Sequence, residues 1–329
     1  MSGETWQLGP LRVEAGRTLR GVYQVDLGRA RIGFPIALIN GTEPDPVLLV
    51  TSGMDGDEYA GVQAALRLID TLDPATVAGR VMVCPILDPL SFEAMQTQNP
   101  LDGLILRQVF PGDLEGKPTQ RLAHFVYQTF IVNADAWLAL GAAEPGEACT
   151  PLVWTFQGDD AFLNTQNRIL LQQCGASVGL LQPLASWDPA PVAVTASTAM
   201  LGSAAGVRGR ADSEAVEAHR RVIDGVLASM SMIAARTAPS TPPVVYTAAA
   251  PLLAESGGLW MARVQPGEMV TAGQPIGEIR RLDGGAVLQT VSSPLEGIVL
   301  AVRTALAVRP RQRLALLAVP PQRKSGDNV

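Results

Sequence analysis

A strand, a helix and a second strand near the start of the chain constrain its fold more than any other feature. Residues 46–53, PVLLVTSG, form a short continuous apolar run that ends in glycine, which is typical of a buried parallel strand. Apolar residues then recur at helical spacing in EYAGVQAALRLIDTL, and RVMVCPIL repeats the pattern of a buried strand. This order predicts a right-handed crossover within an α/β sheet.

The neighbouring segments extend this predicted sheet. Upstream, the alternating runs VYQVDL and IGFPIALI flank Gly28, which predicts two strands joined by a turn. Downstream, a Pro-, Gly- and Asp-rich segment at 88–118 is long enough for a functional loop. We then expect a helix over TQRLAHFVYQTFIVNA, a strand over DAWLALGAA, a helix from Asp160 to about Cys174, short strands near VGLLQP and PVAVTAS, and a long amphipathic helix from Ser213 to about Ala235.

The character of the sequence changes near residue 236. Residues 1–235 are expected to form the α/β domain, and the aperiodic, Pro-containing segment 236–243, RTAPSTPP, is expected to be a linker. Short strands with regularly spaced turns follow over 244–320, which predicts a small all-β barrel or sandwich domain. Residues 321–329 are expected to be a disordered tail.

Composition excludes several classes of partner. A formal net charge of -6 and the lack of Lys and Arg clusters argue against nucleic acid and against a basic membrane-binding patch. The sequence contains neither a signal-peptide pattern nor a long uninterrupted apolar run, so a cytoplasmic location without membrane attachment is expected. The three scattered cysteines indicate reduced thiols rather than a disulfide framework.

Five segments together resemble a known family: TSGMDGDEYAG, PLDGLILRQVFPGD, TQRLAHFVY, ADAWLALG and VQPGEMVTAGQPIGEIRRLDGG. They occur in order over nearly the whole chain and are similar to the succinylglutamate desuccinylase/aspartoacylase family, which is related to the zinc carboxypeptidases. The resemblance implies a carboxypeptidase-like mixed sheet flanked by helices. It also implies a zinc-dependent hydrolase, a deacylase that acts on N-acyl amino acids.

The resemblance places the zinc ligands at positions where this sequence departs from the family. The family's His-Gly-Asp-Glu motif supplies two ligands from its His and Glu, and the matching residues here include Asp55 and Glu58. The third family ligand is a histidine at the end of an Asp-Leu-His strand, where this sequence has Gly141. Asp55 and Glu58 thus remain as possible ligands, whereas glycine offers no ligating side chain.

The family's catalytic and substrate-binding positions have changed as well. Its general base is a glutamate in a Glu-Leu-Gly-like strand, and the corresponding stretch TASTAMLG places either Ser197 or Met200 there. Neither side chain abstracts a proton at neutral pH. The family's substrate-binding arginine is retained as Arg107, but a second family arginine falls near Thr97.

No other residues clearly complete a metal site. The chain has two histidines. We expect His124 to be a core or surface residue of a helix and His219 to face solvent. A third ligand is conceivable in or near the loop after the strand, but no spacing requires it, and the candidates are Glu144, Glu147, Cys149 and Asp135. Two carboxylates alone suit a hard, weakly held ion better than zinc.

Arg107 has two interpretations. It could stabilise its loop through a buried pair with Asp57 or Asp102, or it could bind a carboxylate-bearing ligand with its planar fork. The C-terminal motif QPGEMVTAGQPIGE resembles a biotinyl/lipoyl-type hairpin but has no lysine in its turn. A lid or an oligomer contact is therefore expected there.

These observations lead to three hypotheses. The first is a family member that has lost the usual zinc hydrolysis and serves, without a cofactor, as a binding or partner subunit. The second is a metal-dependent hydrolase of N-acyl amino acids, or of related amides and esters, which uses Asp55 and Glu58 with zinc or another divalent cation. The third is a structural component of an oligomer. The expected partners are a small carboxylate-bearing ligand, a second copy of the chain or a partner protein.

Overall fold

The predicted unit of strand, helix and strand is present. The computed structural model describes residues 4–184, 190–234 and 241–319. Strand β5 (Val47–Thr51), helix α1 (Tyr59–Thr71) and strand β6 (Arg80–Cys84) follow one another, and β5 pairs with β6 in parallel. The short apolar strands and the amphipathic helix therefore form the crossover that their patterns predict.

One large mixed sheet organises the described residues. The other strands of the α/β part are β1 (Trp6–Leu8), β2 (Leu11–Val13), β3 (Arg17–Asp26), β4 (Arg31–Asn40), β7 (Ala136–Gly141), β8 (Glu147–Gln157), β9 (Val178–Pro183) and β10 (Ala199–Val207). Apart from β1 and β2, which pair with each other, these strands belong to the large sheet, whose central order is β8-β10-β7-β5-β6-β4-β3. The predicted pair of strands around Gly28 is confirmed as the antiparallel pair β3 and β4.

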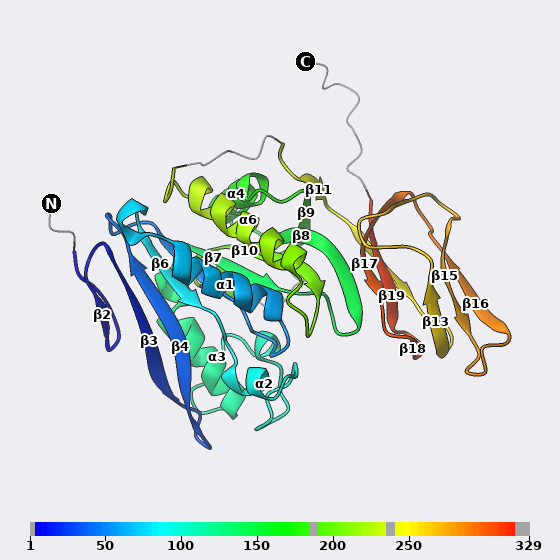
Figure 1. Cartoon of the computed structure of the whole chain (residues 1–329), viewed down its shortest axis with the longest axis horizontal. Helices are drawn as coiled ribbons and strands as arrows, with labels where there is room; N and C mark the ends of the chain where they lie inside the picture. The colour runs from blue at the N-terminus through cyan, green and yellow to red at the C-terminus, as the bar shows by residue number, and fades with distance from the viewer. Residues whose placement is uncertain (1–3, 185–189, 235–240, 320–329) are drawn as a thin grey trace, which may run out of the picture.

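Helices flank this sheet. Helix α6 (Ser213–Ser229) contacts both α1 and α4 (Ala161–Gln173), whereas α3 (Pro118–Thr129) contacts β3 and lies apart from that group (Figure 1). The predicted loop at 88–118 contains short helical turns, α2 (Pro89–Glu93) and η2 (Leu106–Gln108), and two more such turns are η1 (Pro74–Thr76) and η3 (Ile131–Asn133). None of the described helices is long and apolar enough to cross a membrane.

In the middle of the chain one prediction is wrong and one strand is missing from the prediction. The segment PVAVTAS lies mostly in a short helix, α5 (Ala190–Thr195), and the strand of this region, β10, comes after it. Strand β8 was not predicted, although it is eleven residues long. Strand β10 consists largely of Ala, Gly and Ser, which have low strand propensity. Small residues occur there because close neighbours on both faces of the strand leave little space for larger side chains.

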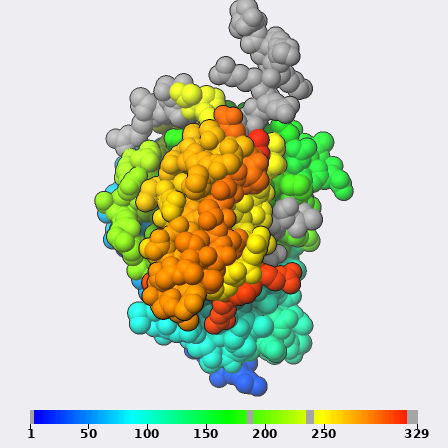
Figure 2. Space-filling model, turned by 90° about the vertical axis from the view of Figure 1, so that its right-hand side faces the viewer, coloured from blue at the N-terminus to red at the C-terminus, as the bar shows by residue number. Residues whose placement is uncertain are grey.

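The C-terminal region is a set of strands that pair mostly in antiparallel fashion, in agreement with the predicted run of short strands. They are β11 (Val244–Tyr246), β12 (Ala249–Leu253), β13 (Gly258–Ala262), β14 (Met269–Val270), β15 (Pro275–Arg280), β16 (Val287–Ser292), β17 (Gly297–Arg303), β18 (Ala307–Val308) and β19 (Arg313–Ala318). Strands β16, β15, β13 and β18 form a four-stranded sheet that packs over β17 and β19 around Trp260, Ile279 and Leu314. Figure 2 shows this region in orange across the centre of one face.

The C-terminal strands also continue the large sheet. Strand β17 pairs with the start of β8, β19 pairs with β17, and β12 pairs with β19. Strand pairing therefore connects the two predicted domains, whose boundaries remain a prediction. Most of the predicted linker, 236–240, and the predicted tail at 321–329 lie outside the described residues.

An aromatic cluster anchors α3 against the strand pair β3 and β4. The rings of Phe34 and Phe130 stack with their centroids 5.4 Å apart, and Phe125 contacts both in edge-on geometry. Tyr23 makes edge-on contacts with Phe125 and Phe130. Phe34 is fully buried. Burial of such rings contributes strongly to folding, since aromatic side chains remove large apolar areas from water.

Replacing Phe34 with alanine should lower the free energy of unfolding by about 3–5 kcal/mol, because the substitution leaves a cavity in this cluster. Urea unfolding followed by circular dichroism measures this change. Phe162→Ala is the matched control, since Phe162 is 72% exposed and its loss should change stability by at most about 0.5 kcal/mol. Equal effects of the two substitutions would contradict the assignment of Phe34 to the core.

Candidate functional site

A cavity of about 510 Å³ lies where three strands of the large sheet end. Strands β5, β7 and β10 run parallel, with Thr51 opposite Ala139 and Gly141 opposite Ala204, so the loops that follow them meet at one edge. Ligand sites of open α/β sheets commonly occupy this edge. Apolar residues of β8, β9 and the C-terminal strands form the opposite wall, among them Leu152, Trp154, Leu180 and Leu316.

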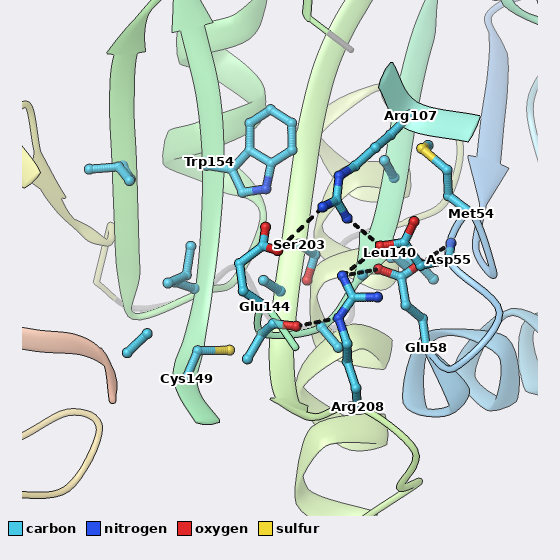
Figure 3. A pocket seen from close by; sticks show the side chains of 18 of the residues that line it. Met54, Asp55, Glu58, Arg107, Leu140, Glu144, Cys149, Trp154, Ser203 and Arg208 are labelled. Carbon is cyan, nitrogen blue, oxygen red and sulfur yellow. Dashed lines mark hydrogen bonds and ion pairs between the residues drawn. The ribbon is translucent and has the colours of Figure 1, made fainter. Parts of the chain in front are cut away.

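A buried arginine, Arg208, occupies the centre of the charged side of this cavity (Figure 3). Its Nη2 lies 2.6 Å from Asp55 Oδ2, its Nη1 donates to Asp57 Oδ1 at 2.8 Å, and its Nε donates to the Ala143 carbonyl at 2.7 Å. Its side chain is only 5% exposed. The guanidinium therefore joins the loops after β5, β7 and β10 and neutralises Asp55.

Sequence analysis did not identify Arg208, because the strand that positions it was predicted several residues too early. The resemblance places the second family arginine near Thr97, in the loop that carries Arg107, where this sequence has no arginine. A second guanidinium does reach the cavity, but it follows β10. The signal that could have revealed it was the small-residue run AMLGSAAGV followed directly by Arg208.

Arg107 reaches the same carboxylate from the other side. It forms an ion pair with Asp55 Oδ2, and its Nη2 lies 3.3 Å from Glu144 Oε2. The predicted pairing of Arg107 with Asp57 or Asp102 is therefore wrong. Asp57 binds Arg208, and Asp102 accepts hydrogen bonds from the start of α3, because each carboxylate lies closer to those donors.

Glu58 is the second buried carboxyl of the site. Its Oε2 accepts a hydrogen bond from the Asp55 backbone N–H at 3.1 Å, whereas its Oε1 lies 3.9 Å from Arg208 Nη2, beyond hydrogen-bond length. Burial, and then repulsion from Asp55, raises the pKa of Glu58 to about 7. Glu58 therefore holds a proton over much of the range in which exposed carboxyls are ionised.

Gly141 lies beside Glu58, as the resemblance implied for the third ligand position. A Cβ atom at this position would lie 3.0 Å from Glu58 Oε1. The glycine leaves that space open but supplies no donor. Gly141 therefore contributes to the site only by leaving space beside the carboxyl group of Glu58.

The residues at the site do not fit a zinc ion. Asp55 Oδ2 is already bound by two guanidinium groups, and a zinc site needs at least three protein ligands. Within the part of the chain that the structure describes, no three His, Cys, Asp or Glu side chains converge as a metal site would require.

The four additional ligand candidates have other contacts. Glu144 pairs with Arg107, and Glu147 pairs with Arg313 at 2.7 Å. Burial raises the pKa of the Cys149 thiol to about 12, which disfavours the thiolate that binds metals. Asp135 precedes β7 and accepts a hydrogen bond from the Val47 N–H, at the opposite end of these strands. None of the four offers a free third ligand beside Asp55 and Glu58.

Both predicted base positions lie outside the cavity. Met200 is fully buried in the core opposite Trp137, and Ser197 is an exposed turn residue that precedes β10. Neither side chain therefore faces the cavity. The strand register instead puts Ala204 beside Gly141 at the cavity, since the side chains of successive strand residues alternate between faces.

The histidines are not part of the cavity lining. His124 is half-buried on α3. His219 is fully buried on α6, so the prediction that it faces solvent is wrong: its Nδ1 lies 2.9 Å from Ser203 Oγ. Burial lowers the pKa of His219 to about 4, and the ring is neutral at pH 7. The charged run around it in the sequence occupies the other face of the helix.

The raised pKa of Glu58 predicts a pH-dependent stability. Because the folded state holds this proton up to about pH 7 and the unfolded chain releases it near 4.5, the contribution of Glu58 is full below pH 4.5 and is lost towards pH 7. The loss amounts to about 3 kcal/mol. Glu58→Gln, which stays neutral, should gain stability relative to the natural protein as the pH rises from about 5 to about 8, measured by urea unfolding.

The matched control is Glu217→Gln on the exposed side of α6. Its stability difference from the natural protein should stay constant over the same pH range, because this exposed carboxyl is already ionised at its lower end. A constant difference for Glu58→Gln as well would show that Glu58 does not titrate in this range.

Removing the guanidinium of Arg208 should destabilise the fold strongly. Arg208→Ala leaves Asp55 buried beside Glu58 with Arg107 as its remaining counter-ion, and removing one partner of a buried ion pair costs about 3–5 kcal/mol. Chemical denaturation measures the change. The matched control is Arg210→Ala, whose exposed pair with Asp212 contributes at most about 1 kcal/mol. Similar losses for the two variants would refute a central role for Arg208.

Comparisons with known proteins agree with this architecture. The model of the succinylglutamate desuccinylase/aspartoacylase catalytic domain matches residues 44–228. A deacetylase of N-alpha-acetyl-L-2,4-diaminobutyric acid from Halomonas elongata is 25% identical over 295 residues, which cover 86% of this chain and 85% of the relative.

Solved structures with lower identity share the fold. A succinylglutamate desuccinylase/aspartoacylase from Rhodobacter sphaeroides superposes with a TM-score of 0.85 at 23% identity, covering 94% of this chain and 98% of its own. The ectoine utilization protein EutE (DoeB) from Ruegeria pomeroyi, solved with bound product, has a TM-score of 0.84 at 17% identity, with 93% and 97% covered. Because the family model covers more than half of the sequence, from β5 to the end of α6, the protein belongs to the succinylglutamate desuccinylase/aspartoacylase family, a family of deacylases.

Proposed function

We propose that this chain binds a small ligand in its cavity and does not hydrolyse N-acyl amino acids by the zinc-assisted route of its family. The observation that carries the proposal is the position of Arg208, whose guanidinium bridges Asp55 and Asp57 beside Glu58. A positive charge from the chain thus stands against the carboxylate at which the resemblance expects a metal ligand.

The chemistry of hydrolysis explains why this matters. A catalytic zinc polarises the carbonyl group and lowers the pKa of its bound water. A guanidinium can donate hydrogen bonds to a carbonyl oxygen, but it has no open coordination position that would activate water. The reaction also needs a general base, and the residues of β10 nearest to Gly141, Ser203 and Ala204, carry no carboxylate.

The retained features support a binding role. The cavity, Arg107 and Glu58 are present, and the loops after β5, β7 and β10 are fixed by buried ion pairs. Its volume is in the range of small-molecule sites. The predicted association with a second copy or a partner protein extends this role and remains a prediction, which light scattering of the purified protein measures.

Metal analysis combined with an activity assay tests the proposal. Purified protein should retain no stoichiometric zinc after incubation with the ion and gel filtration, since three ligands are not available. It should release no acetate from N-alpha-acetyl-L-2,4-diaminobutyric acid and no acyl group from N-acyl aspartate or glutamate. The Halomonas elongata deacetylase is the positive control for the first substrate.

The competing hypothesis, a metal-dependent hydrolase with a rearranged site, predicts the reverse. Stoichiometric zinc together with turnover that Glu58→Ala abolishes would establish that hypothesis and end the proposal. Zinc or turnover that persists in Glu58→Ala would instead point to contamination, because Glu58 is the ligand that the rearranged site cannot lose.

A further inference from the structure

The charged groups around the cavity carry a surplus of negative charge. Four carboxyl groups and two guanidinium groups form one network: Asp55, Asp57, Glu58, Glu144, Arg107 and Arg208. Its net charge is -1 while Glu58 holds its proton and -2 above about pH 7, where Glu58 is ionised as well. The nearby pair of Glu147 and Arg313 is neutral by itself. A ligand that enters this network is therefore stabilised if it is positively charged.

Two buried polar atoms of residues that line the cavity lack hydrogen-bond partners among the described residues. Asp55 is 1% exposed, and its Oδ1 has no hydrogen-bond partner among the described residues; Ser52 Oγ is in the same situation. Both residues line the cavity. A buried polar atom without a partner is unfavourable, so a ligand that donates hydrogen bonds here supplies interactions that the protein itself does not make. Glu58 Oε1, 3.9 Å from its nearest cation, is a further acceptor.

The space beside these acceptors is open and the other wall is apolar. Gly141 lacks the side chain that would contact Glu58 Oε1, and this leaves room at the carboxyl group. Figure 3 shows Asp55 and Glu58 on one side of the cavity and Trp154 on the other. Leu152 and Leu180 lie on the same wall as Trp154. A ligand with a charged head group and an uncharged chain matches this cavity, with its head group at the carboxyl groups and its chain at the apolar wall.

We propose that the cavity binds a small primary amine as its ammonium ion, with the –NH₃⁺ group held by the carboxylates of Asp55 and Glu58 beside Gly141 and the uncharged chain against Trp154 and Leu152. This inference rests on the proposed function, because it assumes that no metal occupies the carboxylates. It names the class of ligand that the proposed function leaves open.

A carboxylate ligand fits the same surroundings less well. It would add to the negative surplus, and to reach Arg107 it must displace Glu144, which already lies 3.3 Å from that guanidinium. A divalent metal ion would stand beside two guanidinium groups without a third ligand. An ammonium ion carries a single charge, supplies three donors and requires no fixed coordination geometry.

Isothermal titration calorimetry of the full chain at about pH 8, where Glu58 is ionised, tests the inference after treatment of the protein with a chelator. Three probes of equal length isolate the head group: n-butylammonium, butyrate and 1-butanol. The ammonium compound should bind, and butyrate and butanol should bind at least about tenfold more weakly, which corresponds to about 1.4 kcal/mol. Zinc and magnesium chloride are titrated separately as the metal probes.

Two variants connect binding to the named residues. Glu58→Gln removes one charge, and Gly141→Val fills the space beside Glu58 Oε1, so each should weaken n-butylammonium binding at least about tenfold. Glu217→Gln is the matched control, because it makes the same chemical change on the exposed side of α6 and should bind as the natural protein does. Thermal melting of each variant establishes that it is folded before titration.

The outcomes separate this inference from the proposed function. Preferred binding of butyrate, binding of a metal ion with no response to the amine, or equal amine affinities for Glu58→Gln and Glu217→Gln would each overturn the inference. Failure of the amine to bind to a chain that carries no zinc and has no deacylase activity would remove the inference alone. Zinc-dependent deacylation would remove the proposed function, whatever the amine does.

Discussion

The site depends on one buried ion pair, between Arg208 and Asp55. A carboxylate that is 1% exposed is costly to bury unless a cation accompanies it, and a guanidinium that is 5% exposed has the same requirement. Each group thus fixes the other. Since Asp55 follows β5, Arg208 follows β10, and the arginine also binds the Ala143 carbonyl after β7, this pair sets how three strand ends meet. The arrangement of these three strand ends forms the charged side of the cavity.

Much of the fold could be predicted because its strongest signals are local. The buried strands β5 and β6 and helix α1 show their type in their own residues, as do the antiparallel strands of the C-terminal region. Strands β8 and β10 could not be predicted in this way. Trp154 of β8 lies where a Cβ at Gly202 would be, so β10 needs a glycine there, and its small residues reflect tertiary packing rather than strand propensity.

The residues of the candidate site also differ in whether local sequence patterns reveal them. Asp55 and Glu58 follow a strand that the sequence reveals, Gly141 ends another, and the resemblance places Arg107 in their vicinity. Arg208 was not predicted, because its role depends on contacts with residues about 150 positions earlier in the chain. The solvent-facing prediction for His219 failed for a related reason: charged neighbours on a helix describe its exposed face, whereas this ring lies on the buried face against Ser203.

The pairing of β17 with β8 has a consequence for synthesis. The first residues of β8, Glu147 to Cys149, pair with β17 on the side away from β10, and Glu147 is neutralised by Arg313 of β19. Until these late strands emerge from the ribosome, β8 has an unpaired edge at the cavity and a carboxylate without its counter-ion. One wall of the cavity is also missing at that stage. The proposed ligand binding therefore requires the C-terminal strands, and a nascent α/β part without them lacks one wall of the site.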